Sequence, residues 1–101
     1  RRGSQGNYRS WAGANSRYMY ILNDLTVGVN TKLYSSNSLG FLYVNGNVYA
    51  EGNLGLDNVS TVYIDGMVTI GAAGTLDFNN GEQTINIGSL RNLRGPSGVE
   101  A

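Results

Sequence analysis

Residues 41–54, FLYVNGNVYAEGNL, carry a pattern that returns in altered form at residues 62–76, VYIDGMVTIGAAGTL. Each copy has two apolar residues separated by one position, then Asn-Gly or Asp-Gly, a second apolar pair, a glycine-rich segment and a leucine. The stretch is either a β-hairpin used twice or one coil of a repeating solenoid. The choice between these two structures decides the fold.

From residue 25 onward, apolar residues come in pairs whose members are two positions apart, a spacing that places both on one face of a β-strand. The pairs are Leu25/Val27, Leu42/Val44, Val48/Ala50, Leu54/Leu56, Val62/Ile64, Val68/Ile70, Leu76/Phe78 and Ile85/Ile87, with Leu33 standing alone. The glycines and asparagines between the pairs predict corners with positive φ.

Taken in threes, these pairs recur with a period of roughly 20 to 23 residues, a length typical of solenoid repeats. One class begins at Leu25, Val48 and Val68, a second at Leu33, Leu54 and Leu76, and a third at Leu42, Val62 and Ile85. The segment LTVGVNTKL at 25–33 also matches VTIGAAGTL at 68–76. Three short strands per period predict a coil whose repeats stack to extend one continuous core.

The hairpin alternative rests on Asn-Gly and Asp-Gly, which are strong two-residue turn signals. A hairpin at Asn45-Gly46 would place Val44 opposite Asn47 and move Val48 and Ala50 to the other face of the sheet. A corner keeps both pairs on one inner face, so the corner is favoured. It predicts an interior lined by Val48, Ala50, Leu54, Leu56, Val62, Ile64, Val68, Ile70, Leu76 and Phe78.

The predicted fold is therefore all-β, a repetitive β-helical or β-solenoid segment with coils of roughly 20 to 23 residues. Residues 1–21 are predicted to be a Gly/Asn/Arg-rich N-terminal arm or cap, 22–90 the β-helical repeat region, and 91–101 an exit linker. TINIGSL at 84–90 begins a fourth coil. The chain opens with Arg-Arg, which we interpret as the start of a piece of a longer protein.

The net charge of zero hides a segregation of charge along the chain. Arg1, Arg2, Arg9 and Arg17 precede a mildly acidic body in which Lys32 is the one base before residue 91. We interpret the basic segment as a solvated linker. Contact with nucleic acid is the less favoured alternative.

The composition favours a protein that is not an enzyme. The 101 residues include no cysteine and no histidine, which excludes thiolate metal sites, disulfides and a histidine-activated nucleophile. Asp57, Asp65 and Asp77 are the acids to consider, because β-helices that cleave polysaccharides use paired carboxylates. Their positions suit solubility better, so we expect no catalytic, cofactor or metal site. No apolar run is long enough for a membrane helix, so no membrane insertion is expected.

The outward positions between paired apolar residues include Tyr43, Tyr49 and Tyr63. Tyr43 and Tyr63 occupy the same place on successive coils. A phenol offers apolar area and a hydrogen bond, so these tyrosines are predicted to contact another subunit or a glycan. The alternative is a solvated stack that only supports the sheet.

The segments LGFLYVNGNVYAEGNLGL (39–56) and MVTIGAAGTLDFNNGEQTINIGSL (67–90) resemble shaft or connector segments of bacteriophage tail fibres and tailspikes, YVNGNVYA most of all. The resemblance covers roughly residues 22–90. It implies a homotrimeric structural rod in a tail appendage of the virion, linking virion attachment to receptor recognition. Its implied partners are adjoining fibre proteins and a host surface glycan.

Two other functions stay open. The segment VTIGAAGTLDF (68–78) is similar to bactofilins, which implies a self-assembling bacterial β-helical filament or surface protein. The other open function is that of a β-helix that binds or cleaves carbohydrate. A parallel homotrimer is expected in the favoured case, because it covers both the outward tyrosines and the open strand edges.

Overall fold

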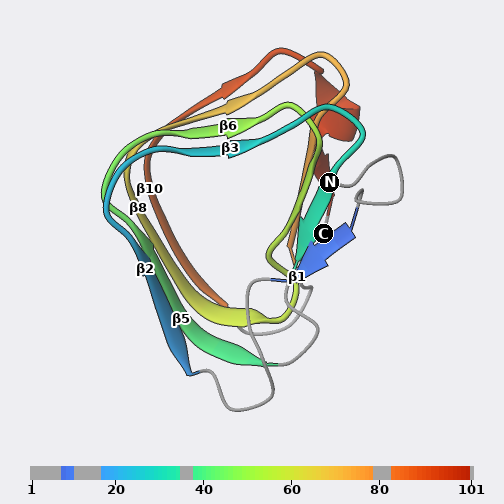
Figure 1. Cartoon of the computed structure of the whole chain (residues 1–101). Helices are drawn as coiled ribbons and strands as arrows, with labels where there is room; N and C mark the ends of the chain where they lie inside the picture. The colour runs from blue at the N-terminus through green and yellow to red at the C-terminus, as the bar shows by residue number, and fades with distance from the viewer. Residues whose placement is uncertain (1–7, 11–16, 35–37, 79–82, 101) are drawn as a thin grey trace.

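The chain forms a parallel β-solenoid of about three turns in a computed structural model that describes residues 8–10, 17–34, 38–78 and 83–100. Viewed along its axis, the backbone traces a triangle around a closed interior (Figure 1). Every hydrogen-bonded pair of strands in the described residues is parallel. Stacked coils, rather than hairpins, therefore build the molecule.

Two sheets supply the three sides of the triangle. Side A is one sheet of β1 (Tyr8–Ser10), β4 (Lys32–Tyr34), β7 (Asn53–Gly55), β9 (Thr75–Asp77) and β11 (Val99–Glu100). The second sheet bends at a corner into sides B and C. Side B holds β2 (Tyr18–Ile21), β5 (Leu39–Val44) and the first parts of β8 (Val59–Ile70) and β10 (Thr84–Asn92). Side C holds β3 (Leu25–Val27), β6 (Val48–Ala50) and the second parts of β8 and β10.

The strand register confirms the three predicted classes of apolar pairs. Leu25, Val48 and Val68 align on side C, Leu33, Leu54 and Leu76 on side A, and Leu42, Val62 and Ile85 on side B. Each class recurs because one full coil returns the chain to the same side, one strand spacing of ~4.8 Å further along the axis.

Asn45-Gly46 is a corner, as predicted. It joins β5 to β6, and both strands pair in parallel with β8 instead of with each other. The expectation of positive φ is confirmed at Asn30, in the corner after β3, and is wrong for the described glycines between the apolar pairs. Within the described residues, positive φ occurs at Asn30 and Gly95. Gly46 is needed because a Cβ there would collide with the Asn23 backbone and the Asp24 carboxylate of the preceding coil.

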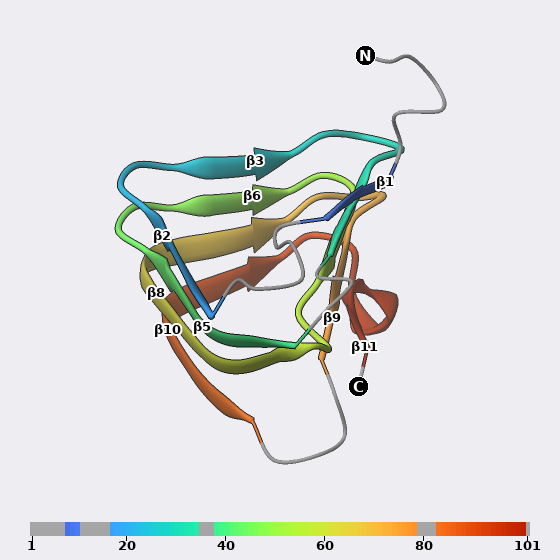
Figure 2. The ribbon, with the colours of Figure 1, turned by 60° about the horizontal axis from the view of Figure 1, so that its bottom comes forward.

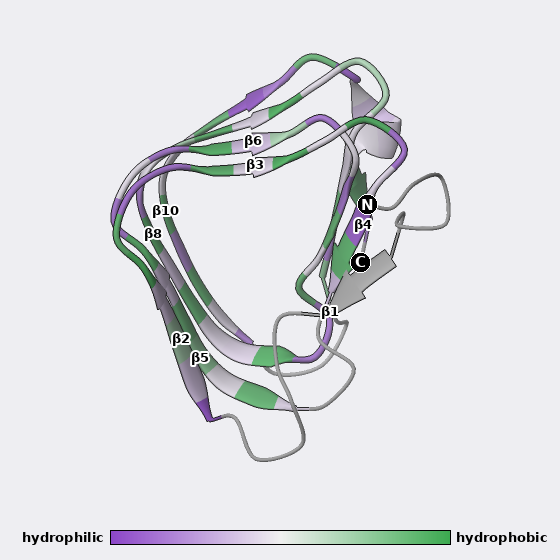
Figure 3. Ribbon diagram, viewed as in Figure 1, coloured by the Kyte–Doolittle hydropathy of each residue, from purple (hydrophilic) through white to green (hydrophobic). Residues whose placement is uncertain are grey.

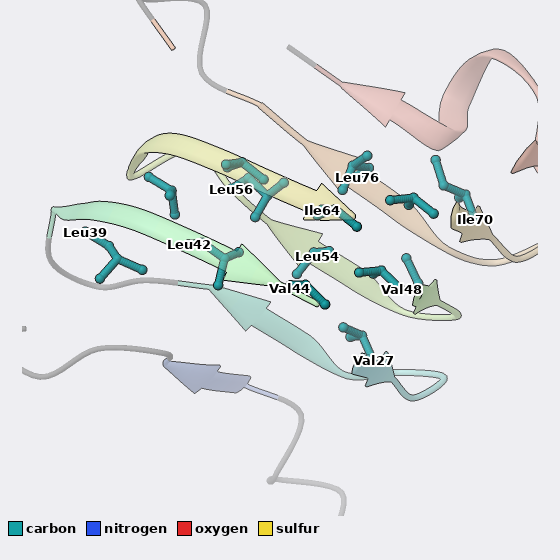
Figure 4. Close-up of a cluster of buried hydrophobic side chains, with 14 residues drawn as sticks. Val27, Leu39, Leu42, Val44, Val48, Leu54, Leu56, Ile64, Ile70 and Leu76 are labelled. Carbon is teal, nitrogen blue, oxygen red and sulfur yellow. The ribbon is translucent and has the colours of Figure 1, made fainter. Parts of the chain in front are cut away.

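The interior is a single apolar cluster enclosed by the three sides (Figure 4). Its buried members are Val27, Leu39, Leu42, Val44, Val48, Ala50, Leu54, Leu56, Val59, Val62, Ile64, Val68, Ile70 and Leu76. Figure 3 shows the corresponding alternation of apolar and polar positions along the strands. Nine of the ten residues predicted to line the interior belong to this buried cluster. The tenth, Phe78, follows the end of β9, is half-buried and packs against the cluster.

Strands also pair outside the predicted repeat region 22–90. β1 and β2 add strands at the N-terminal side, and Met19 and Ile21 of β2 align with Leu42 and Val44. At the other end, a short 3₁₀ turn, η2 (Pro96–Gly98), leads into β11 on side A (Figure 2). The last coil is less covered than the others: Ile85 and Ile87 are half-buried and Leu90 is 50% exposed.

Candidate functional site

Five aromatic side chains from three successive coils gather on the outside of side B. We call this set, Tyr18, Tyr20, Phe41, Tyr43 and Tyr63, the aromatic face. It forms because the outward positions of β2, β5 and β8 align, with Tyr18 beside Phe41 and Tyr20, Tyr43 and Tyr63 in one column. Period-two alternation puts all five outside while their neighbours fill the core.

Ring contacts join the aromatic face into one surface. Tyr43 and Tyr63 stack with centroids 5.3 Å apart and ring planes within 7°. Phe41 and Tyr43 lie 6.4 Å apart at 8°, and Tyr20 contacts both Phe41 and Tyr43 at about 6 Å. In the two stacked pairs the ring faces that meet are covered, whereas Tyr18 and Tyr20 meet edge to face with centroids 5.7 Å apart.

The N-terminal part of the aromatic face is the most exposed. Tyr18 and Tyr20 are 64% and 59% exposed, and Tyr63 is 41% exposed. No Asp, Glu, Lys or Arg occupies the aligned outward positions of the aromatic face. An uncharged surface rich in tyrosine is typical of a protein contact.

Tyr49 lies apart from the other two predicted tyrosines. It is on β6, so its side chain projects from side C, in the column Thr26, Tyr49, Thr69 and Arg91. A shallow depression of about 250 Å³, the side C groove, is lined by Asn47, Tyr49, Met67, Thr69 and Arg91. The structure thus brings Tyr43 and Tyr63 together and places Tyr49 in a different surface.

Tyr18, Tyr20 and Phe41 were not predicted as contact residues. The signal was present, because Met19 and Ile21 form an apolar pair one period before Leu42 and Val44. Extending the period one coil toward the N-terminus would have assigned Tyr18 and Tyr20 to the outside of side B.

The corner between sides B and C is held by side-chain hydrogen bonds that pass from coil to coil. The Asn47 backbone N–H donates to Asp24 Oδ1 (2.8 Å), and the Met67 N–H donates to Asn47 Oδ1 (2.9 Å). Each side chain thereby satisfies a backbone donor at the same corner of the next coil. This ladder fixes Asn47 and Met67 at the edge of the side C groove.

The acids considered for catalysis lie at separate places. Asp57 is in the turn after β7, Asp65 is at the corner within β8, and Asp77 ends β9 on side A. The Asp77 Oδ1 atom is buried and has no hydrogen-bond partner among the described residues. The described residues contain no group of three or more acidic, histidine or cysteine side chains arranged to hold a metal ion. The expectation of no enzyme activity stays a prediction.

Two further expectations concern charge and membranes. Of the four N-terminal arginines, Arg17 alone has a described side chain, which is exposed; Arg1, Arg2 and the Arg9 side chain lie outside the described part. In that same part of the chain, no helix has the length and apolar character needed to span a bilayer.

Comparison with known proteins gives no relative. No protein-family model, curated protein or solved structure matches the chain.

Proposed function

We propose that this chain is a structural segment of a bacteriophage tail fibre or tailspike, assembled as a parallel homotrimer through the aromatic face. The observation that carries the proposal is the aromatic face itself, five contiguous aromatic side chains on one side of the solenoid. The assignment to a phage appendage rests on the resemblance of residues 22–90 to fibre shafts.

The register of side B supports this packing. The exposed side chains come from β2, β5 and β8, which lie in parallel register, so the surface extends along the solenoid axis. Three copies related by a threefold axis parallel to the solenoid would bring equivalent tyrosines around that axis. Such closed symmetry covers apolar surface without leading to unlimited growth.

The proposed trimer gives the segment a mechanical role. A solenoid holds whatever is attached at its two ends at a fixed separation along its axis. Three copies side by side resist bending better than one. The partners in this proposal are adjoining proteins of the fibre, with a host surface glycan as the target of the appendage. The proposed location is the virion.

Analytical ultracentrifugation tests the trimer. The wild-type chain is expected to sediment as a trimer at micromolar concentration, and Tyr43→Ser with Tyr63→Ser is expected to shift it toward monomer while far-UV circular dichroism keeps its β-signal. The matched control is Tyr49→Ser, which removes a tyrosine from side C and should leave the trimer intact. A folded wild-type monomer would defeat the proposal.

Electron microscopy distinguishes the structural alternatives. The proposal expects discrete particles of uniform length. Filaments that lengthen with protein concentration would instead support the bactofilin-like alternative.

A further inference from the structure

We infer that the side C groove binds a sugar that carries a carboxylate, such as a sialic or uronic acid residue. This inference goes beyond the proposed structural role and does not depend on it. In a trimer packed through side B, side C faces away from the axis and stays accessible. Figure 2 shows its strands β3, β6, β8 and β10 stacked as one continuous wall.

The first argument is the state of the Tyr49 ring. Tyr49 is 38% exposed, and no other aromatic ring of the described chain contacts it, whereas Tyr43 and Tyr63 cover one another. The exposed part of such a ring attracts weakly positive C–H groups, because the ring face carries the negative part of the quadrupole. The C–H groups of a pyranose are of this kind.

The second argument is that the groove is rich in hydrogen-bond donors. Asn47 Oδ1 already accepts from the Met67 N–H, so the Asn47 amide offers its NH₂ group. Thr69 adds a hydroxyl. Arg91 adds a guanidinium, and among the described residues no carboxylate pairs with it. These groups select a ligand that accepts hydrogen bonds.

Arg91 determines the charge of that ligand. A guanidinium binds a carboxylate through two parallel N–H···O bonds, which a neutral hydroxyl cannot match. Arg91 aligns with Thr69, which aligns with Tyr49, so the Cα atoms of Tyr49 and Arg91 lie two strand spacings apart, about 10 Å. A sugar ring above Thr69 can contact Tyr49 at one end and direct its carboxylate to Arg91 at the other.

The size of the groove limits the ligand. A depression of about 250 Å³ is smaller than the ~300–1,000 Å³ of sites for drug-sized ligands. It therefore suits one or two sugar residues of a longer chain. Because the groove is shallow, we expect a weak Kd, on the order of 1 mM.

The test is an NMR titration of the wild-type chain with 3′-sialyllactose, with lactose as the neutral control. Sialyllactose should shift the backbone resonances of Tyr49, Thr69 and Arg91 saturably, and lactose should not. Arg91→Gln should weaken the binding of sialyllactose about tenfold or more, and Arg91→Lys by less, since lysine keeps the charge without the planar fork. Tyr49→Ala should also weaken it about tenfold.

The matched control is Arg17→Gln, which removes one exposed arginine on side B and should leave the Kd unchanged. Three results would overturn the inference: no saturable shift at the groove, unchanged affinity in Arg91→Gln, or equal shifts with inorganic phosphate alone. Ultracentrifugation of the same samples distinguishes failure of the proposed sugar site from failure of the proposed trimer. A trimer that binds no sialyllactose contradicts the groove only, and a monomer that binds it contradicts the trimer only.

Discussion

At the scale of single residues, neighbouring positions of a strand have opposite environments. Val68 is fully buried and Thr69, the next residue, projects outward. Val68→Asp is expected to prevent folding, because an unpaired buried charge costs several kcal/mol out of a typical total of about 5–15 kcal/mol. Thr69→Asp should lower the free energy of unfolding by less than about 1 kcal/mol. Urea denaturation measures both, and equal damage at the two positions would contradict the alternation.

Two glycines on either side of one corner provide a second contrast. A Cβ on Gly74 would collide with the Ala50 carbonyl oxygen, whereas a Cβ on Gly71 has its nearest neighbour at 3.4 Å. Gly74→Ala should therefore destabilise the fold by about 2 kcal/mol or more, because backbone must move, and Gly71→Ala by less than about 1 kcal/mol. Thermal denaturation of the two variants tests the difference. A Gly74→Ala protein as stable as Gly71→Ala would show that the coils are spaced more widely than described.

At this scale, alternation in the sequence was sufficient to predict which side chains face inward. It was not sufficient to explain the glycines. Gly46 and Gly74 are required by atoms of the preceding coil, and those contacts exist only once the coils are stacked. These glycines were predicted to serve local turns with positive φ. The structure shows that they are needed because a side chain there would collide with the neighbouring coil.

At the scale of elements, the corner between sides B and C depends on Asn47. Its carboxamide oxygen accepts a hydrogen bond from the Met67 backbone N–H, and the Asn47 backbone N–H donates to Asp24 Oδ1. Asn47→Ala should lower the free energy of unfolding by about 1 kcal/mol, since the Met67 donor loses its partner. Asn47→Asp keeps an acceptor and should cost less.

Asn86 is the matched control for this corner. It is exposed and lies in the middle of a strand, in the column of Tyr63. Asn86→Ala should change the free energy of unfolding by less than about 0.5 kcal/mol. If chemical denaturation shows the same loss for Asn47→Ala and Asn86→Ala, the ladder contributes nothing to stability.

The corners also show why element boundaries were harder to predict than elements. Between their inward residues, the first three coils place three residues at the corner of sides B and C, whereas the last coil places Gly88 and Ser89 there. The register of β10 against β8 therefore shifts between Ile87 and Ser89. Asp65-Gly66 and Gly88-Ser89 both resemble turns in the sequence. The strand pairing is what shows that the corner of the last coil is one residue shorter than the others.

At the scale of the whole molecule, the period of the apolar pairs was enough to predict three sides and their register. It did not predict the aromatic face, because Tyr18 and Tyr20 fell within the segment assigned to an N-terminal arm or cap. The classes of apolar pairs place Tyr49, between Val48 and Ala50, on another side than Tyr43 and Tyr63. The prediction nevertheless treated the three tyrosines as one kind of contact, and the strand pairing shows that they belong to two separate surfaces.

The parallel pairing of coil on coil also determines how the molecule yields to force. Hydrogen bonds between coils run along the solenoid axis, so tension between the two ends strips the outermost coil before it loads the next. Each released coil adds about 70 Å of extended chain. Because the chain has no cysteine, handles can be attached uniquely through Arg17→Cys and Glu100→Cys. Optical tweezers on the Tyr43→Ser, Tyr63→Ser background should record a series of such steps, whereas one rupture that frees the whole chain would show that the coils unfold as a unit.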